Sequence, residues 1–203
     1  MGDEKIKFNE NKLDVLRELA NIGVGNAVTA LSQMLNEEKI GMDVPIVDLV
    51  LLQDVPEMLG GAEQPVAGVY IESHGDLSLT FLFVLPLDSA ARLITILVPD
   101  SIGDFDEMGL SALIEVGNIL TGSYLNALSA LTNLRLMASP PEIAVDMSGA
   151  IITTVVAEAN IADDKVVLLK TSLNAFESHI EGHVIILPGS DALSKIFALL
   201  GIR

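Results

Sequence analysis

Asp14–Ser32 reads DVLRELANIGVGNAVTALS, and Ser111–Ser129, which begins 97 residues later, reads SALIEVGNILTGSYLNALS. The two stretches are identical at eight of 19 positions. In the first copy these positions are Leu16, Glu18, Asn21, Ile22, Gly25, Ala30, Leu31 and Ser32. Self-similarity of this kind indicates a repeated structural unit.

A second match follows the first in the same order. Phe83–Pro86 (FVLP) aligns with Ile185–Pro188 (IILP) at an offset of 102 residues, and a short helical pattern follows in both places. The stretch between the halves, Pro99–Asp106, is too short for an interdomain linker. We therefore expect one domain built of two pseudo-symmetric halves, residues 8–100 and 104–203.

Each half shows the same order of predicted elements. A long helix opens it, over Asn11–Asn36 and Asp106–Asn133, with Asn9 or Asn11 and Asp104 or Asp106 as candidate N-caps. A short helix closes it, over Asp88–Leu97 and Ser190–Leu200. The strand-like runs between them are Val47–Leu52, Val66–Glu72, Leu77–Leu85, Ile143–Val145, Ile151–Val156, Val166–Leu173 and Gly182–Leu187. Ile151–Val156 also fits a helix that runs to Ala159.

The strand spacing favours an antiparallel sheet. A turn-like stretch, Ser73–Asp76, separates Val69 from Leu79, as in a hairpin. We predict an α+β fold in which the two halves share one sheet and the two long helices carry the functional residues.

Composition narrows the function classes. The chain has 203 residues, of which 50% are hydrophobic and 19% charged, with a formal net charge of −17. So apolar a chain is not disordered, and so negative a chain is repelled by nucleic acid and by anionic lipid. Cysteine is absent, which excludes disulfides and thiolate chemistry.

No segment of the sequence predicts targeting or membrane insertion. The N-terminus is charged and lacks the apolar stretch of a signal peptide. The longest uncharged stretch, Val116–Leu134, holds too many Asn, Ser, Thr and Gly residues for a transmembrane helix. We expect a cytoplasmic protein.

Each long helix carries a polar stripe. Because a helix turns by about 100° per residue, Asp14, Glu18 and Asn21 occupy one arc about 60° wide, opposite Leu16, Leu19, Gly23 and Ala27. The stripe continues through Gly25 and Ser32; in the second helix it comprises Ser111, Glu115, Asn118, Gly122 and Ser129.

Ordinary structural roles also fit these residues: Glu is common on solvated helix faces, and Gly permits close helix packing. Repetition of Glu, Asn and Gly on one polar face favours a functional role, because packing does not dictate them there.

The residue types limit the chemistry. None of His74, His179 and His183 lies near either stripe in sequence, so no histidine-based triad or typical metal site is predicted. An Asn amide can orient a water molecule, and a Glu carboxylate can pair with a cation. Together they suit hydrolysis of a phosphoryl group held by a partner. No nucleotide-binding GxxxxGK[ST] loop is present.

These residues resemble the signature of the CheC/CheX/FliY phosphatases, [DS]-x3-E-x2-N-x22-P. Ser111, Glu115, Asn118 and Pro141 fit it in full. The first copy departs by one residue, because 23 residues rather than 22 separate Asn21 from Pro45. Two intact copies in about 200 residues resemble the CheC branch of the family.

The resemblance implies a phosphatase of the phosphorylated chemotaxis regulator CheY. Asn21 and Asn118 would orient the attacking water, and Glu18 and Glu115 would pair with the regulator's active-site lysine. The Mg²⁺ would belong to the regulator, and this chain would bind no cofactor or metal. CheD is implied as a second partner.

Further expectations concern docking. We expect Asp14, Gly25, Ser111 and Gly122 to contact the partner, the two glycines as a flat floor beneath it. Two sites on one chain suggest that a monomer suffices. Two alternatives stay open: a non-catalytic docking module for phospho-CheY or CheD, and a metal-dependent hydrolase with Asp14, Glu18 and Glu115 as ligands.

Overall fold

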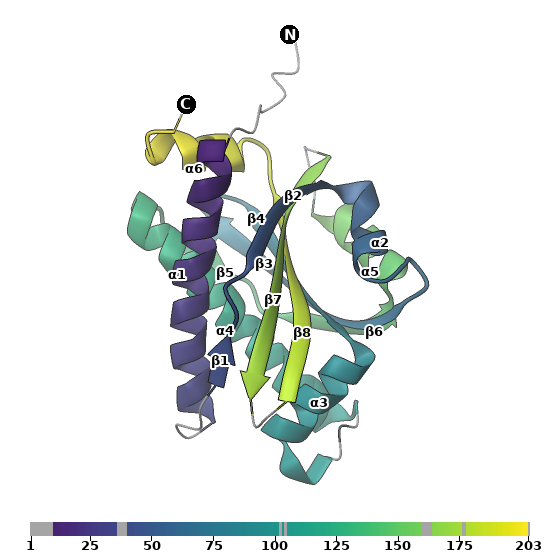
Figure 1. Ribbon diagram of the computed structural model, residues 1–203. Helices are drawn as coiled ribbons and strands as arrows, with labels where there is room; N and C mark the ends of the chain where they lie inside the picture. Colours follow the sequence, from purple (N-terminus) through teal and green to yellow (C-terminus); the bar gives the residue numbers. More distant parts are fainter. Residues whose placement is uncertain are drawn as a thin grey trace.

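An antiparallel sheet runs through the centre of the molecule, with helices on both of its faces (Figure 1). The computed structural model describes residues 10–35, 40–101, 103, 105–159, 164–175 and 178–202. The first half contains α1 (Glu10–Met34), β1 (Ile40–Met42), β2 (Ile46–Leu51), η1 (Leu52–Asp54), α2 (Val55–Met58), β3 (Pro65–Gly75), β4 (Leu79–Pro86) and α3 (Leu87–Leu97). After η2 (Pro99–Ser101), the second half contains α4 (Glu107–Thr132), β5 (Leu136–Ala138), β6 (Glu142–Met147), α5 (Ser148–Glu158), β7 (Lys165–Ala175), β8 (Ser178–Pro188) and α6 (Ala192–Leu199).

The halves exchange strands across this sheet. β4 pairs with β8 at the centre, and each of these pairs on its other side with the long strand of its own half, β3 or β7. The short strands pair with the opposite half: β1 and β2 with β7, and β5 and β6 with β3. The expected antiparallel sheet shared by both halves is confirmed.

The same irregularity occurs at both edges of the sheet. Between β1 and β2 the chain advances four residues, from Met42 to Ile46, while its partner β7 advances three. Between β5 and β6 it also advances four, while β3 again advances three. One extra residue on the edge strands, as in a β-bulge, therefore recurs at equivalent places.

Two hydrophobic cores lie on opposite faces of the sheet. The larger packs α1, α3, α4 and α6 against one face, and its members include Leu31, Phe83 and Val116. The smaller packs α2 and α5 against the other face, around Val55, Leu82 and Ile151.

The two long helices follow their predicted bounds closely. On α1 the buried residues repeat every three to four positions: Leu16, Ala20, Gly23, Val24, Ala27 and Leu31. On α4 the Asp106 side chain accepts a hydrogen bond from the Gly109 N–H at 2.8 Å, which confirms Asp106 as the N-cap. Asn11 lies inside α1, so its prediction as an N-cap is wrong; Asn9 and Asp104 lie outside the described residues.

One predicted strand is wrong. Ile151–Val156 belongs to helix α5, which confirms the alternative of a helix extending toward Ala159. Its buried residues Ile151, Ile152 and Val155 have helical spacing and pack against the second core. A short run of β-branched residues fits both states in sequence, and here packing against the sheet face selects the helix.

The second sequence match, Phe83–Pro86 with Ile185–Pro188, does not align structurally equivalent residues. The offset of 102 aligns Leu85 with Leu187, but Leu85 lies in the larger core and Leu187 in the smaller one, on the other face of the sheet. Side chains alternate between faces along a strand. The residue of β8 that is structurally equivalent to Leu85 is therefore not Leu187 but one that lies an odd number of positions away from it.

The histidines differ in environment. His179 is exposed and contacts Asn174 at 2.8 Å, as expected for a solvated residue, whereas His183 is 8% exposed. From the sequence we expect His179 and His183 to be solvated or loosely packed, and for His183 the solvated alternative is wrong. Burial, with the nearby positive charge of Lys170, lowers the pKa of His183.

We predict that His183 makes the protein less stable in mild acid. Its pKa is lower in the folded state than in the unfolded chain, where it is about 6.5. The unfolded state therefore takes up the proton first, and stability falls as the pH drops below that value. Urea unfolding at a series of pH values should show a flatter pH dependence for His183→Gln than for the unmodified chain; an identical slope would contradict the assignment.

Candidate functional site

The polar stripe of each long helix faces solvent. Asp14, Glu18, Asn21 and Gly25 on α1 are all exposed. On α4, Ser111, Glu115 and Asn118 are exposed and Gly122 is half-buried. Ser32 and Ser129, farther along, are half-buried. The opposite side of each helix packs in the larger core, so the fold presents both predicted stripes outward.

The four central side chains lack intramolecular partners. Within the described part of the chain, Glu18, Asn21, Glu115 and Asn118 make no side-chain hydrogen bond or ion pair. Asn has low helix propensity, because its amide competes for backbone hydrogen bonds. A mid-helix Asn on an exposed face, in both copies, therefore contributes little to the fold.

The glycines of the stripes are not packing glycines. A Cβ built on Gly25 or Gly122 meets no atom within 4 Å. In contrast, a Cβ on Gly23 would lie 2.7 Å from Cε1 of Tyr124, and one on Gly117 would lie 2.6 Å from Cγ1 of Val69. Helical periodicity already places Gly23 opposite the stripe and Gly25 on it. Close helix packing explains Gly23 and Gly117 but not Gly25 or Gly122.

The first residue of each stripe, Asp14 or Ser111, is bonded to a neighbour on its own helix. On α1, Nη1 of Arg17 lies 2.9 Å from Oδ1 of Asp14 and 3.6 Å from Oε1 of Glu10. On α4, the Ser111 hydroxyl donates to the backbone carbonyl of Glu107 at 2.7 Å. Arg17 is not among the residues predicted from the sequence, although its i,i+3 spacing from Asp14 is a recognisable ion-pair signal.

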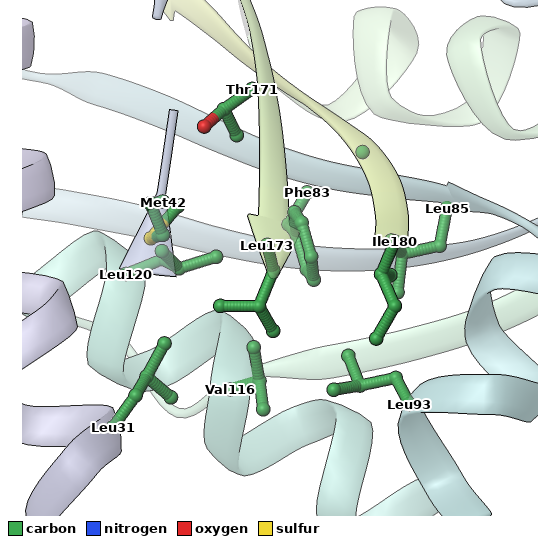
Figure 2. Close-up of a pocket in the computed structure, with 11 residues that line it drawn as sticks. Leu31, Met42, Phe83, Leu85, Leu93, Val116, Leu120, Thr171, Leu173 and Ile180 are labelled. Carbon is green, nitrogen blue, oxygen red and sulfur yellow. The ribbon is translucent and has the colours of Figure 1, made fainter. Parts of the chain in front are cut away.

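Two small voids lie in the larger core of the described part of the chain. Figure 2 shows side chains from α1, α3, α4 and the sheet converging on a void of about 20 Å³ in the larger core. A second void, about 50 Å³, adjoins Tyr124 and is lined by aliphatic residues and Phe81. Both voids are small and are lined mainly by apolar side chains.

A larger cleft, about 160 Å³, lies on the other face of the sheet between α5 and strands β3 and β6. Its lining includes Tyr70, Glu142, Asp146 and Glu158. Burial and the hydrogen bond to Glu72, 2.5 Å long, raise the pKa of Tyr70. The cleft contains none of the predicted site residues.

Among the residues that the structure describes, no three His, Asp or Glu side chains are placed to share a metal ion, so the metal-dependent alternative has no supporting cluster. No helix in the same ranges is both long and apolar enough to cross a bilayer.

Comparison with known proteins identifies the family. A CheC-like family profile matches residues 12–48 and 108–145, which contain both stripes. The CheY-P phosphatase CheC of Bacillus subtilis strain 168 is 36% identical over 201 residues, covering 96% of each chain. The chain therefore belongs to the CheC-like family.

Solved structures share the fold. The crystal structure of Thermotoga maritima FliY matches with a TM-score of 0.75 at 20% identity, covering 97% of this chain and 98% of that one. A CheX–CheY–BeF₃–Mg²⁺ complex from Borrelia burgdorferi matches with a TM-score of 0.50 at 17% identity, covering 83% of this chain and 96% of that one. The predicted α+β class is confirmed.

The contrast between the glycines gives a stability prediction. Gly23→Ala should destabilise the protein by about 1–3 kcal/mol, because the new methyl group overlaps the buried Tyr124 ring. Gly25→Ala should instead stabilise it by up to about 1 kcal/mol, because Ala is the better helix former and the space is open. Urea unfolding measures both, and equal effects would contradict the distinction.

Proposed function

We propose that this chain is a phosphatase that hydrolyses the aspartyl phosphate of phospho-CheY. The observation that carries the proposal is the pair of exposed Glu/Asn stripes whose side chains have no partner within the described chain and whose glycines leave open space above the helix. The name of the Bacillus subtilis relative, CheY-P phosphatase, supports the same activity.

Asn21 and Asn118 position the attacking water. A neutral amide is a poor acid or base, but its carbonyl can accept a hydrogen bond from water and its NH₂ can donate one. The oriented water attacks phosphorus in line with the bond to the aspartyl oxygen. That bond breaks, and inorganic phosphate and the free carboxylate are released. Positioning of this kind is the main requirement of phosphoryl transfer.

Glu18 and Glu115 orient the partner. Each carboxylate lies three residues before its Asn and is exposed, so it can pair with a lysine of the regulator's active site. A charge-assisted hydrogen bond of this kind fixes the direction of approach. The helix would then present the Asn amide to the phosphoryl group.

The metal ion belongs to the partner in this proposal. The Borrelia burgdorferi complex contains Mg²⁺ and a beryllofluoride group together with CheX and CheY. We propose by analogy that Mg²⁺ sits on the regulator and that this chain supplies the Glu and the Asn. The chain then needs no cofactor of its own.

We propose one domain of two pseudo-symmetric halves, about 8–100 and 104–203, that works as a monomer in the cytoplasm. The repeated element order and the equivalent register step at both sheet edges support it. Asp14, Gly25, Ser111 and Gly122 would border the docked regulator, and CheD would be a second, regulatory partner.

A non-catalytic docking module is the second candidate, because docking alone would also use an open polar stripe. Decay of the acyl phosphate on CheY distinguishes the two. We predict that the chain accelerates decay, that Asn21→Ala and Asn118→Ala each abolish one site, and that the double variant loses acceleration by at least about 100-fold, the scale on which misplaced catalytic geometry acts.

Binding and folding are the controls for this experiment. The double variant should still bind beryllofluoride-activated CheY, and its unfolding midpoint should not fall, because neither Asn side chain has a partner in the described structure. Retained binding without hydrolysis establishes the enzyme. Binding by the unmodified chain without any acceleration, with CheD absent and then present, leaves the docking module.

A further inference from the structure

A buried void lies beneath the first half of α1, on the side of the helix opposite the stripe. Its volume is about 50 Å³, and α1 contributes Leu16, Leu19 and Ala20 to its lining. The rest of the lining comes from α4, α6 and strands β4, β7 and β8. α6 lies beside the first turns of α1 (Figure 1), where Nζ of Lys12 is 5.5 Å from the ring centroid of Phe197. The void is therefore separate from the exposed Glu/Asn pair.

Among the described residues that line this void, Tyr124 alone has a polar side chain. Tyr124 is 5% exposed, and its ring packs against Gly23 and stacks on Phe81 at a centroid distance of 6.4 Å. Its hydroxyl is buried and has no hydrogen-bond partner within the described part of the chain. Burial raises the pKa of Tyr124, so the hydroxyl stays protonated and can donate. Because buried tyrosine hydroxyls are normally hydrogen-bonded, a bound molecule that accepts this bond would complete the site.

The remaining lining is aliphatic apart from Phe81. A water molecule in a protein interior needs roughly two to four polar partners, and cavities lined by Leu, Ile and Phe stay dry and take apolar molecules instead. One hydroxyl is too few to hold a water molecule, but it can bond the single polar group of a mostly apolar molecule. The lining therefore favours a molecule with an apolar body and one hydrogen-bond acceptor.

The size of the void limits the molecule. One water-sized group needs about 10–15 Å³, so a void of about 50 Å³ accommodates about three such groups. The void in Figure 2, about 20 Å³, has room for about one. Benzene occupies a cavity of about 150 Å³ and is too large for either void. Of the two, the void beside Tyr124 is the one that fits a small organic molecule.

We propose that the void beneath α1 is a binding site for a small, mostly apolar molecule, such as a short-chain alcohol, that accepts a hydrogen bond from Tyr124. The inference goes beyond the proposed function, because the site lies on the packed side of α1 and uses no residue of either stripe. A molecule that binds only the folded state raises the unfolding midpoint. Occupancy of the void should therefore stabilise the packing of α1 on the sheet.

Ethanol and propane are the probes, because they match in size and only ethanol has a hydroxyl group. Each is titrated into the full chain and followed by methyl NMR, and nuclear Overhauser contacts to Leu16 and Ile196 give the position of the probe. Benzene is the size control. We expect ethanol and propane to shift the methyl signals of the lining residues and benzene to leave them unchanged. Absence of binding by both small probes would overturn the inference.

Tyr124→Phe tests the hydrogen bond, since it keeps the ring against Gly23 and removes the hydroxyl. Ethanol should bind this variant about 3- to 10-fold more weakly, the range expected for loss of one hydrogen bond. Propane should bind it at least as well as it binds the unmodified chain. An unchanged ethanol affinity, or an equal loss for both probes, would contradict a hydrogen bond from Tyr124. A long-lived water molecule bonded to Tyr124 that ethanol does not displace would also overturn the inference.

Ala20→Val tests the location, because the added methyl groups occupy the void. Both probes should bind this variant at least about 10-fold more weakly, the scale on which overpacking acts. Ala27→Val is the matched control, since Ala27 is a buried alanine of the same helix that lines neither void. It should lower the unfolding midpoint more than Ala20→Val and leave both affinities unchanged. Unchanged affinities in Ala20→Val would place the probes elsewhere and overturn the inference; if that variant does not fold, Tyr124→Phe decides alone.

Discussion

The pairing of β4 with β8 joins the two halves, and the rest of the structure depends on it. With this pair at the centre, each half completes the sheet of the other, because β1 and β2 pair with β7 while β5 and β6 pair with β3. Neither half can form its full sheet alone. The same arrangement places α1 and α4 on one face of the sheet, where they share a core.

The shared core leaves one side of each long helix exposed. Leu16, Ala20 and Leu31 of α1, and Val116 and Leu120 of α4, are buried on the packed side. The opposite side carries Glu, Asn and a glycine with open space above it. In the proposed function this exposed side would meet a substrate that is itself a folded protein, and that partner would supply the phosphoryl group.

Sequence predicted the long helices, the antiparallel sheet and the exposed stripes, because each depends on local periodicity that repeats in both halves. It missed β1, β5 and α2, which are only three or four residues long and form through contacts with the rest of the fold. It placed Gly23 opposite the stripe and Gly25 on it, but it could not show that the Tyr124 ring packs against Gly23. The strand assigned to Ile151–Val156 failed because a β-branched run has no decisive period.

The claim that a partner rests directly on the helix is tested by filling the open space at Gly122. Gly122→Leu is made in the Asn21→Ala background, so that only the α4 site acts, and the decay rate of phospho-CheY is measured beside the urea unfolding midpoint. We predict a loss of at least about 10-fold in rate, since displacements of about 1 Å already impair positioning. No atom lies within 4 Å of the added Cβ, and an unchanged unfolding midpoint would show that the loss of rate does not come from unfolding. Full activity with the leucine in place would contradict the account.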